Sequence, residues 1–274
     1  MFTDKDLEIF NKQGYLIVRS LFAKEEVQAL RSFAENNDSL KESTFSKGDG
    51  EGGSIDMALW NNVDDSLFGL FPRSERLVNR MEQLTGDEVY HYHSKLIQKN
   101  PGTGGAWTWH QDYGYWYQNG LLYADKVASV MVAVDQATKE NGCLQVIEGS
   151  HNIGRIDHLL TGEQAGADME VVNAAKEQLP HIHVELEQGD ALFFHSNLLH
   201  RSDQNKSTKP RWALISCYNS KSNNPFKKSH HPEYSPLKKV KDEDVLKGLK
   251  NGNANLDWLS HDRDRSASIL EKDK

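Results

Sequence analysis

The sequence predicts a mainly β protein with flanking helices, folded as a sandwich or jelly roll. Short apolar segments follow one another from Val89 to Tyr218, with Gly, Asn and Asp residues between them. The regular alternation of strands and helices that marks a doubly wound sheet does not occur. With 274 residues, the chain can bury a substantial core, and β folds of this size commonly form one domain. We therefore expect one domain over residues 1–274.

The first 88 residues predict a helical lead-in to the sheet. The predicted elements are a helix between Thr3 and Gly14, a strand over residues 15–18, a helix over residues 23–36 and a helix between Ser74 and Gly86. Residues 47–53 contain four glycines, which make ordered backbone costly. They predict a mobile loop, which either connects two elements or acts as a lid over an active site.

Residues from about 89 to 220 predict the β core, and residues from about 221 to 274 predict a polar tail. The expected strands cover residues 89–99, 107–112, 127–134, 143–147, 182–186, 191–194 and 212–218. Residues 152–180 form a polar insertion in which no helical or strand period is clear. In the tail, Val245, Leu246 and Leu249 are spaced for a short helix that docks on the core.

Charge and cysteine content limit the classes of partner. Forty acidic against 32 basic residues give a net charge of −8, which disfavours a broad nucleic-acid-binding surface. The first residues lack the basic and apolar regions of a signal peptide, and no segment has the roughly 18 consecutive apolar residues of a membrane span. Cys143 and Cys217 lie in apolar segments and are expected to be buried thiols in a reducing compartment. We expect a soluble cytoplasmic protein that binds a small molecule, with neither nucleic acid nor a membrane as partner.

The stretch from Trp107 to Tyr117 carries the first candidate for a functional site. Alternate side chains of a strand share a face, so His110 and Asp112 point one way and Gln111 points the other. Non-haem Fe(II) oxygenases bind their metal with two histidines and one carboxylate. The pair can therefore be part of a metal site that needs a third ligand, or it can be an ordinary hydrogen-bonded pair.

Several histidines compete for the place of the third ligand. His91 and His93 alternate on one predicted strand, and His181, His183 and Glu185 alternate on another. Both sets also fit a half-exposed strand or a hydrogen-bonded sheet edge. His200 is the best candidate, because an apolar strand enters a short polar loop and emerges there.

Arg211, at the start of another apolar strand, is either a charge at the end of a sheet or a fork that holds a carboxylate.

Four segments together resemble the phytanoyl-CoA dioxygenase family of iron(II)- and 2-oxoglutarate-dependent oxygenases. They are His110-Gln111-Asp112 after Trp109, the run from Asn141-Gly142-Cys143-Leu144 to Gly149-Ser150-His151, the run from His195 to Ser202 that contains His200, and Arg211. Their order and spacing match the family over most of the chain. The Asn-Gly-Cys-Leu segment is more specific than the His-x-Asp pair alone.

The resemblance implies a cupin-like double-stranded β-helix, a jelly roll whose mouth holds Fe(II). His110, Asp112 and His200 would be the metal ligands. The resemblance further implies that Arg211 pairs with the distal carboxylate of the cosubstrate 2-oxoglutarate, with Ser202 assisting and Gln98 as a weaker candidate. The implied reaction uses O2 to hydroxylate a C–H bond and releases succinate and CO2. Related halogenases replace the carboxylate ligand by a small residue, so the presence of Asp112 favours hydroxylation.

The substrate is left open between several classes. Tyr113, Tyr115, Trp116 and Tyr117 either pack at the mouth of the barrel or contact substrate as an ammonium cage or an acyl slot. A cage favours a small cationic or zwitterionic substrate, such as an amino acid, a betaine or an aminophosphonate.

Three alternatives remain open. An acyl-CoA hydroxylase of the phytanoyl-CoA type would have Lys227, Lys228, Lys238 and Lys239 as unspecific phosphate contacts. A non-catalytic metal-binding sensor would keep the same ligands without turnover. A zinc hydrolase could use two histidines and a carboxylate, but would not need Arg211.

Overall fold

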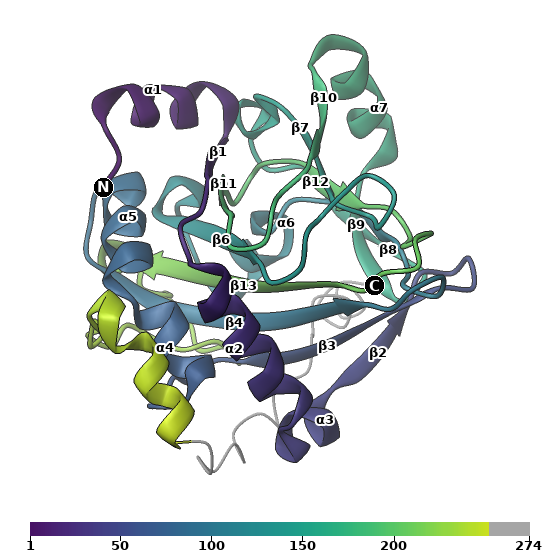
Figure 1. The fold of residues 1–274 in the computed structure, drawn as a ribbon. Helices are drawn as coiled ribbons and strands as arrows, with labels where there is room; N and C mark the ends of the chain where they lie inside the picture. Colours follow the sequence, from purple (N-terminus) through teal and green to yellow (C-terminus); the bar gives the residue numbers. More distant parts are fainter. Residues whose placement is uncertain (252–274) are drawn as a thin grey trace.

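Two antiparallel sheets enclose the central core, and helices cover their outer faces (Figure 1). The computed structural model describes residues 1–251. The strands are β1 (Tyr15–Val18), β2 (Phe45–Gly48), β3 (Ser54–Trp60), β4 (Val89–Lys99), β5 (Trp107–His110), β6 (Val127–Ala133), β7 (Leu144–Ile147), β8 (His158–Thr161), β9 (Gln164–Ala167), β10 (His181–Val184), β11 (Ala191–His195), β12 (His200–Ser202) and β13 (Arg211–Ser220). The helices are α1 (Asp4–Gln13), α2 (Lys24–Glu35), α3 (Asp38–Ser43), α4 (Leu67–Arg73), α5 (Glu75–Thr85), α6 (Tyr113–Trp116) and α7 (Met169–Gln178).

The strand order is that of a jelly roll, in which neighbours in a sheet are distant in the chain. The seven-stranded sheet has the order β1-β11-β6-β13-β4-β3-β2, and the four-stranded sheet has the order β10-β7-β12-β5. Strands β8 and β9 form a separate hairpin. Because β1, β2 and β3 all join the large sheet, the lead-in supplies three strands of the β structure as well as its helices.

Three clusters of buried side chains hold these layers together. The cluster between the sheets combines Met131 and Ile215 of the large sheet with Val146 of the small one. Helices α2, α4 and α5 pack on the outer face of the large sheet (Figure 1). Helix α7 covers the small sheet through Val172 and Ala175. Each sheet is therefore apolar on both faces, which fits the nearly continuous apolar runs of β6 and β13.

The predicted helix between Thr3 and Gly14 is confirmed with its caps. The Thr3 hydroxyl accepts a hydrogen bond from the Asp6 backbone N–H, and the Asp6 carboxylate accepts one from the Thr3 backbone in return. Gly14 has a φ of 82°, and its N–H donates to the carbonyl of Phe10. The chain can then turn at once into β1, whose four residues pair with β11.

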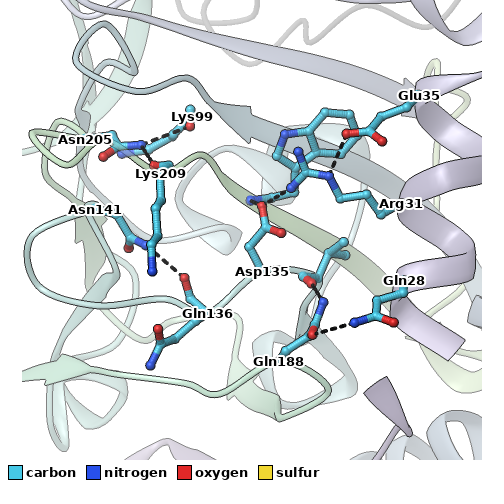
Figure 2. A network of polar contacts seen from close by, with 12 residues as sticks. Gln28, Arg31, Glu35, Lys99, Asp135, Gln136, Asn141, Gln188, Asn205 and Lys209 are labelled. Carbon is cyan, nitrogen blue, oxygen red and sulfur yellow. Dashed lines mark hydrogen bonds and ion pairs between the residues drawn. The ribbon is translucent and has the colours of Figure 1, made fainter. Parts of the chain in front are cut away.

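Helix α2 is fastened to the large sheet by a polar network (Figure 2). Arg31 makes ion pairs with Glu35 on its own helix and with Asp135, which follows β6. The Arg31 guanidinium also lies 4.4 Å from the ring centroid of Trp212, and the backbone N–H of Trp212 donates to the Asp135 carboxylate at 3.0 Å. One arginine therefore links a helix to two adjacent strands.

Two predicted irregular segments have more structure than expected. Residues 47–53 belong to the hairpin of β2 and β3, where Asp49 accepts hydrogen bonds from the backbones of Glu51, Gly53 and Ala106 and from the Gln204 side chain. Residues 49–53 form the loop that connects β2 to β3, which agrees with the predicted connector, and one carboxylate satisfies several of its N–H groups. Residues 152–180, predicted as a polar insertion without a period, contain β8, β9 and α7.

The predicted helix of the tail is present as a 3-10 helix over Asp242–Asn251, in which Val245 is fully buried but Leu249, also predicted to dock, is exposed. The remaining residues of the predicted tail, 252–274, lie outside the described part. Within residues 1–251, no helix combines the length and the apolar character that crossing a bilayer requires.

Candidate active site

His110, Asp112 and His200 come together at the inner face of the small sheet. His110 ends β5 and His200 begins β12, and the two residues are opposite each other in the antiparallel ladder. The strand predicted over residues 107–112 ends earlier, at His110, because Asp112 has helical backbone angles and begins the turn into α6; its carboxylate nevertheless faces His110. One ligand atom from each of the three residues lies within 4.8 Å of the others.

The three side chains are oriented as metal ligands rather than as hydrogen-bonded partners. Nε2 of His110 lies 3.8 Å from Oδ1 of Asp112, and Nε2 of His200 lies 4.0 Å from the same oxygen. Both separations are too long for hydrogen bonds. The Nδ1 atoms instead contact the backbone carbonyls of Thr108 and Leu198, each at 2.9 Å. Nδ1 therefore carries the hydrogen, and the lone pair of each Nε2 faces the carboxylate.

Burial keeps both imidazoles in the neutral form that binds metals. Desolvation lowers the pKa of His110 well below its usual value, and the nearby His200 lowers it further. Desolvation also lowers the pKa of His200, against the opposing effect of Asp112. Two neutral imidazole nitrogens and one carboxylate oxygen on one side of a point fit a divalent iron ion, with its other positions left open.

Neighbouring side chains fix the carboxylate of Asp112. Ser129 on β6 donates to Oδ2 at 3.0 Å, and the Tyr115 hydroxyl donates to Oδ1 at 3.2 Å. Gln111 points to the opposite side, as predicted, and its side chain bonds the backbones of Gly154, Ile156 and Asn197. The strand end is therefore held on both faces, and this fixes the direction of its ligands.

A second polar cluster in the same cavity contains two buried cations. Arg211 on β13 is opposite Lys99 on β4 in the strand ladder. Nζ of Lys99 donates to Oγ of Ser202 at 2.8 Å and to the backbone carbonyl of Asp203. Burial lowers the pKa of Lys99 well below its usual value and that of Arg211 to about 10. No carboxylate bonds either cation among residues 1–251, so the cluster lacks a counter-anion there.

Gly142 explains part of the Asn-Gly-Cys-Leu segment. Its φ of 75° is in the left-handed region, and a Cβ there would lie 2.2 Å from the carbonyl oxygen of Asp203. The Gly142 carbonyl accepts a hydrogen bond from Nη2 of Arg211 at 2.9 Å. This turn therefore aligns the guanidinium, whose Nε has no hydrogen-bond partner in the described chain.

The two clusters line one cavity between the sheets, with about 40 Å³ of free interior space. Its lining includes His110, His200, Lys99, Ser202 and Arg211.

Gln98, the weaker cosubstrate candidate, is not brought into this cavity. Lys95, Ile97 and Lys99 occupy the inner face of β4, so Gln98 points to the other face. The sequence did not predict that Lys99 lines the cavity. The alternation of side chains along this strand indicates it only once the inner face is known.

The aromatic residues after Asp112 are also absent from the lining of this cavity. Tyr113 donates to the carbonyl of Leu121, and Trp116 is buried against Tyr92 and His93. Tyr117 lies under the guanidinium of Arg155, 4.2 Å from its ring centroid. Tyr115 has the contact with Asp112 described above and stacks on His110.

The competing histidines have other partners. His91 bonds the Asn61 carbonyl and Ser94, His93 contacts Cys217, and His181 bonds Gln145. Within the described part of the chain, the only cluster of three or more potential metal ligands is His110, Asp112 and His200.

Two histidines and one carboxylate within reach of one metal ion, set in a jelly roll beside two buried cations, are typical of the class of non-haem iron oxygenases. A family model described as phytanoyl-CoA dioxygenase (PhyH) matches residues 10–213. The chain belongs to the phytanoyl-CoA dioxygenase family, and it is a 2-oxoglutarate-dependent non-haem iron dioxygenase that uses Fe(II), 2-oxoglutarate and O2.

Relatives with named activities act on small molecules. L-proline trans-4-hydroxylase of Streptomyces griseoviridis is 29% identical over 212 residues, which cover 68% of this chain and 74% of that protein. Ectoine dioxygenase of Bordetella bronchiseptica is 27% identical over 245 residues, covering 82% and 79%. The crystal structure of EctD from S. alaskensis with 2-oxoglutarate and 5-hydroxyectoine has a TM-score of 0.74 at 23% identity and covers 88% of each chain. The predicted double-stranded β-helix is thereby confirmed.

Proposed function

We propose that this protein is a hydroxylase that inserts one oxygen atom into a C–H bond of a small polar substrate. The observation that carries the proposal is that the two histidines of a triad suited to iron share one cavity with a buried cation cluster suited to a dicarboxylate. A zinc hydrolase would not require the second cluster.

In this proposal, Nε2 of His110, Nε2 of His200 and Oδ1 of Asp112 bind the iron. The geometry behind these ligands supports the assignment, since each Nδ1 is occupied by a backbone carbonyl and Oδ2 of Asp112 is occupied by Ser129. When bound, the iron supplies the activation of O2, so that one oxygen atom enters the substrate and the other enters the succinate formed from 2-oxoglutarate with loss of CO2.

Arg211 and Lys99 bind the distal carboxylate of 2-oxoglutarate in the same proposal. The unpaired Nε of Arg211 supplies a donor, and the Ser202 hydroxyl, which accepts a hydrogen bond from Lys99, supplies another. An anion bound there would supply the counter-charge that these buried cations lack. Leu144, which is opposite Ser202 in the strand ladder, adds an apolar wall at this end of the cavity.

A small zwitterionic substrate is favoured over an acyl-CoA. The relatives named for proline and ectoine support this choice. The four lysines considered for an acyl-CoA phosphate, Lys227, Lys228, Lys238 and Lys239, do not line the cavity. An aromatic ammonium cage is not supported either, because the described cavity wall carries none of the four aromatic residues.

We also propose that the chain acts as one catalytic domain in the cytoplasm. The continuity of the large sheet from the lead-in to the β core supports a single unit. The free, buried thiols of Cys143 and Cys217 suit a reducing compartment.

Anaerobic titration of the Fe(II)-loaded protein with 2-oxoglutarate tests the assignment. We expect a metal-to-ligand charge-transfer band in the wild type, a weakened band in Arg211→Ala and none in His110→Ala. An undiminished band in Arg211→Ala would contradict the cosubstrate site. Succinate release is then screened with L-proline, ectoine, betaines, aminophosphonates and acyl-CoAs. A band without coupled succinate release from any compound would favour a non-catalytic sensor.

A further inference from the structure

Four cations line the cavity, and one of them has no partner. Lys99 bonds Ser202 and Asp203, and Arg211 bonds the Gly142 carbonyl. Arg201 forms an ion pair with Asp203 at 2.5 Å. Lys95, also in the lining, has neither a hydrogen bond nor an ion pair with any residue of the described chain. No Asp or Glu is present in the described lining to neutralise it.

Lys95 belongs to the metal end of the cavity rather than to the end that holds Arg211. It lies on the inner face of β4, four residues from Lys99, which corresponds to about 13 Å along an extended strand. Its strand partner is Ile215, whereas Lys99 pairs with Arg211. Ile215 lies two residues before Cys217, whose Sγ contacts the Ser129 hydroxyl that bonds Asp112. The position of Lys95 is therefore near the metal ligands.

The surroundings of Lys95 are suited to a molecule that is partly apolar. Ile55, Met57 and Trp107 lie in the lining of the same cavity, together with Ile97 next along the inner face of β4. A cation beside aliphatic and aromatic side chains recognises an anionic group attached to a compact apolar body. A quaternary ammonium group would instead be repelled by this lysine.

We infer that Lys95 binds a carboxylate of the substrate and thereby selects a carboxylic acid, such as an amino acid, over its neutral derivatives. This inference rests on the proposed hydroxylase function and specifies its substrate class. Because the two carboxylates of 2-oxoglutarate are used by the metal and by the Arg211 cluster, the charge of Lys95 is left for the substrate. Anchoring one carboxylate near the iron would also fix which C–H bond faces it.

A panel of free L-amino acids, L-proline and ectoine, each with its carboxamide where one can be made, tests the assignment. Wild-type protein with Fe(II) and 2-oxoglutarate is assayed for succinate release with every compound. Binding is measured separately, as the rise in Tm of the anaerobic protein loaded with Fe(II) and 2-oxoglutarate. We expect at least one acid to bind and to couple, and its amide to be weaker by about 10- to 100-fold in kcat/KM.

Three variants isolate the contact. Lys95→Met should lose the preference for the acid over its amide, whereas Lys95→Arg should retain it, and neither should change the Kd of 2-oxoglutarate. Lys47→Met is the matched control, since Nζ of Lys47 lies 5.3 Å from the ring centroid of Trp107 but Lys47 is not in the lining. It should keep the preference within about threefold, because a more distant charge is screened.

The outcomes separate the inference from the proposed function. Absence of 2-oxoglutarate binding in the wild type would refute the proposed function itself. With 2-oxoglutarate bound, the inference is overturned if amides couple as well as acids, if no acid in the panel binds, or if Lys95→Met keeps the preference. A weaker Kd of 2-oxoglutarate in Lys95→Met with unchanged acid preference would assign Lys95 to the cosubstrate instead. If Lys47→Met and Lys95→Met lose the preference for the acid equally, the preference arises from the overall positive charge near the cavity and not from a contact with Lys95.

Discussion

The hydroxyl of Ser129 donates a hydrogen bond to Oδ2 of Asp112 at 3.0 Å, and both side chains are buried. The same hydroxyl lies 3.2 Å from Sγ of Cys217, and that sulfur lies 3.4 Å from Nε2 of His93. A chain of four buried polar groups thus extends behind the triad. It occupies one oxygen of Asp112 and leaves Oδ1 directed at His110 and His200, with the Tyr115 hydroxyl beside it.

Ser129→Ala should weaken Fe(II) binding because Asp112 loses the bond that fixes its orientation. Partners of this kind typically contribute 10- to 100-fold to metal affinity, so we expect a rise in the Kd of Fe(II) of about that size. Anaerobic titration of the metal measures it.

Ser94→Ala is the matched control. Ser94 is a buried serine of β4, on the other side of β13 from β6, and it bonds His91 and Ser216. Its removal should leave iron affinity unchanged. Equal Kd values for Ser129→Ala and the wild type would mean that the backbone alone orients Asp112.

Arg211→Lys should raise the KM for 2-oxoglutarate, because lysine keeps the charge but loses the planar fork. Lys99→Met should have a similar effect by removing the second buried cation and leaving Ser202 without its donor. Charge-assisted hydrogen bonds contribute about 1.5–3 kcal/mol, so each KM should rise by about 10- to 100-fold. Steady-state succinate formation measures this once a coupled substrate is known, and unchanged KM values in both variants would contradict the cosubstrate site.

The sequence predicted the residues of the metal triad better than it predicted their surroundings. The strand alternation placed His110 and Asp112 on one face without knowledge of the fold. The position of His200 opposite His110 depends on the register of β12 against β5, and the sequence alone does not determine which strands become neighbours. The family resemblance supplied that missing step.

The sequence did not predict the role of Lys99 or the secondary structure of residues 152–180. Lys99 was overlooked in favour of Gln98 because a strand covered on both faces has an apolar pattern that does not show which face is inner. In the insertion, Gln164 on β9 bonds the backbones of Thr108, Gly48 and Ala106. These contacts are distant in the chain, so the local sequence has no period that reports them.

Arg31→Met should destabilise the fold by about 1–3 kcal/mol, because Asp135 would lose the cation that compensates its burial. Desolvation is the largest cause of the raised pKa of Asp135, and Arg31 opposes it. Urea unfolding at pH 7.5 measures the change. Lys41→Met removes an exposed partner of Asp38 and should cost less than about 0.5 kcal/mol. If both variants lose the same amount, the Arg31 pair contributes no more than a surface pair.

His195 should make the protein less stable at mildly acidic pH. It is mostly buried, lies beside His151 and Phe10, and accepts a hydrogen bond at Nδ1 from the Asn197 N–H. Desolvation lowers its pKa to about 3, below the value of about 6.5 expected for an unfolded chain. The unfolded state therefore takes up a proton as the pH falls below 6.5, while the folded state does not. The contribution of the neutral His195 imidazole to the free energy of unfolding is therefore complete above pH 6.5. It is lost progressively as the pH falls to about 3.

His195→Asn removes this titration and retains an acceptor for the Asn197 N–H. Between pH 7.5 and pH 5.0, the free energy of unfolding should fall by about 2 kcal/mol less in the variant than in the wild type. Urea unfolding of the metal-free proteins at the two pH values measures the difference, because bound iron would add its own pH dependence. The comparison with wild type removes the contribution that the other buried histidines make to the pH dependence. His91 is one of them, since burial lowers its pKa to about 4. Equal pH dependence in the two proteins would mean that His195 becomes protonated in the folded state near its ordinary pKa.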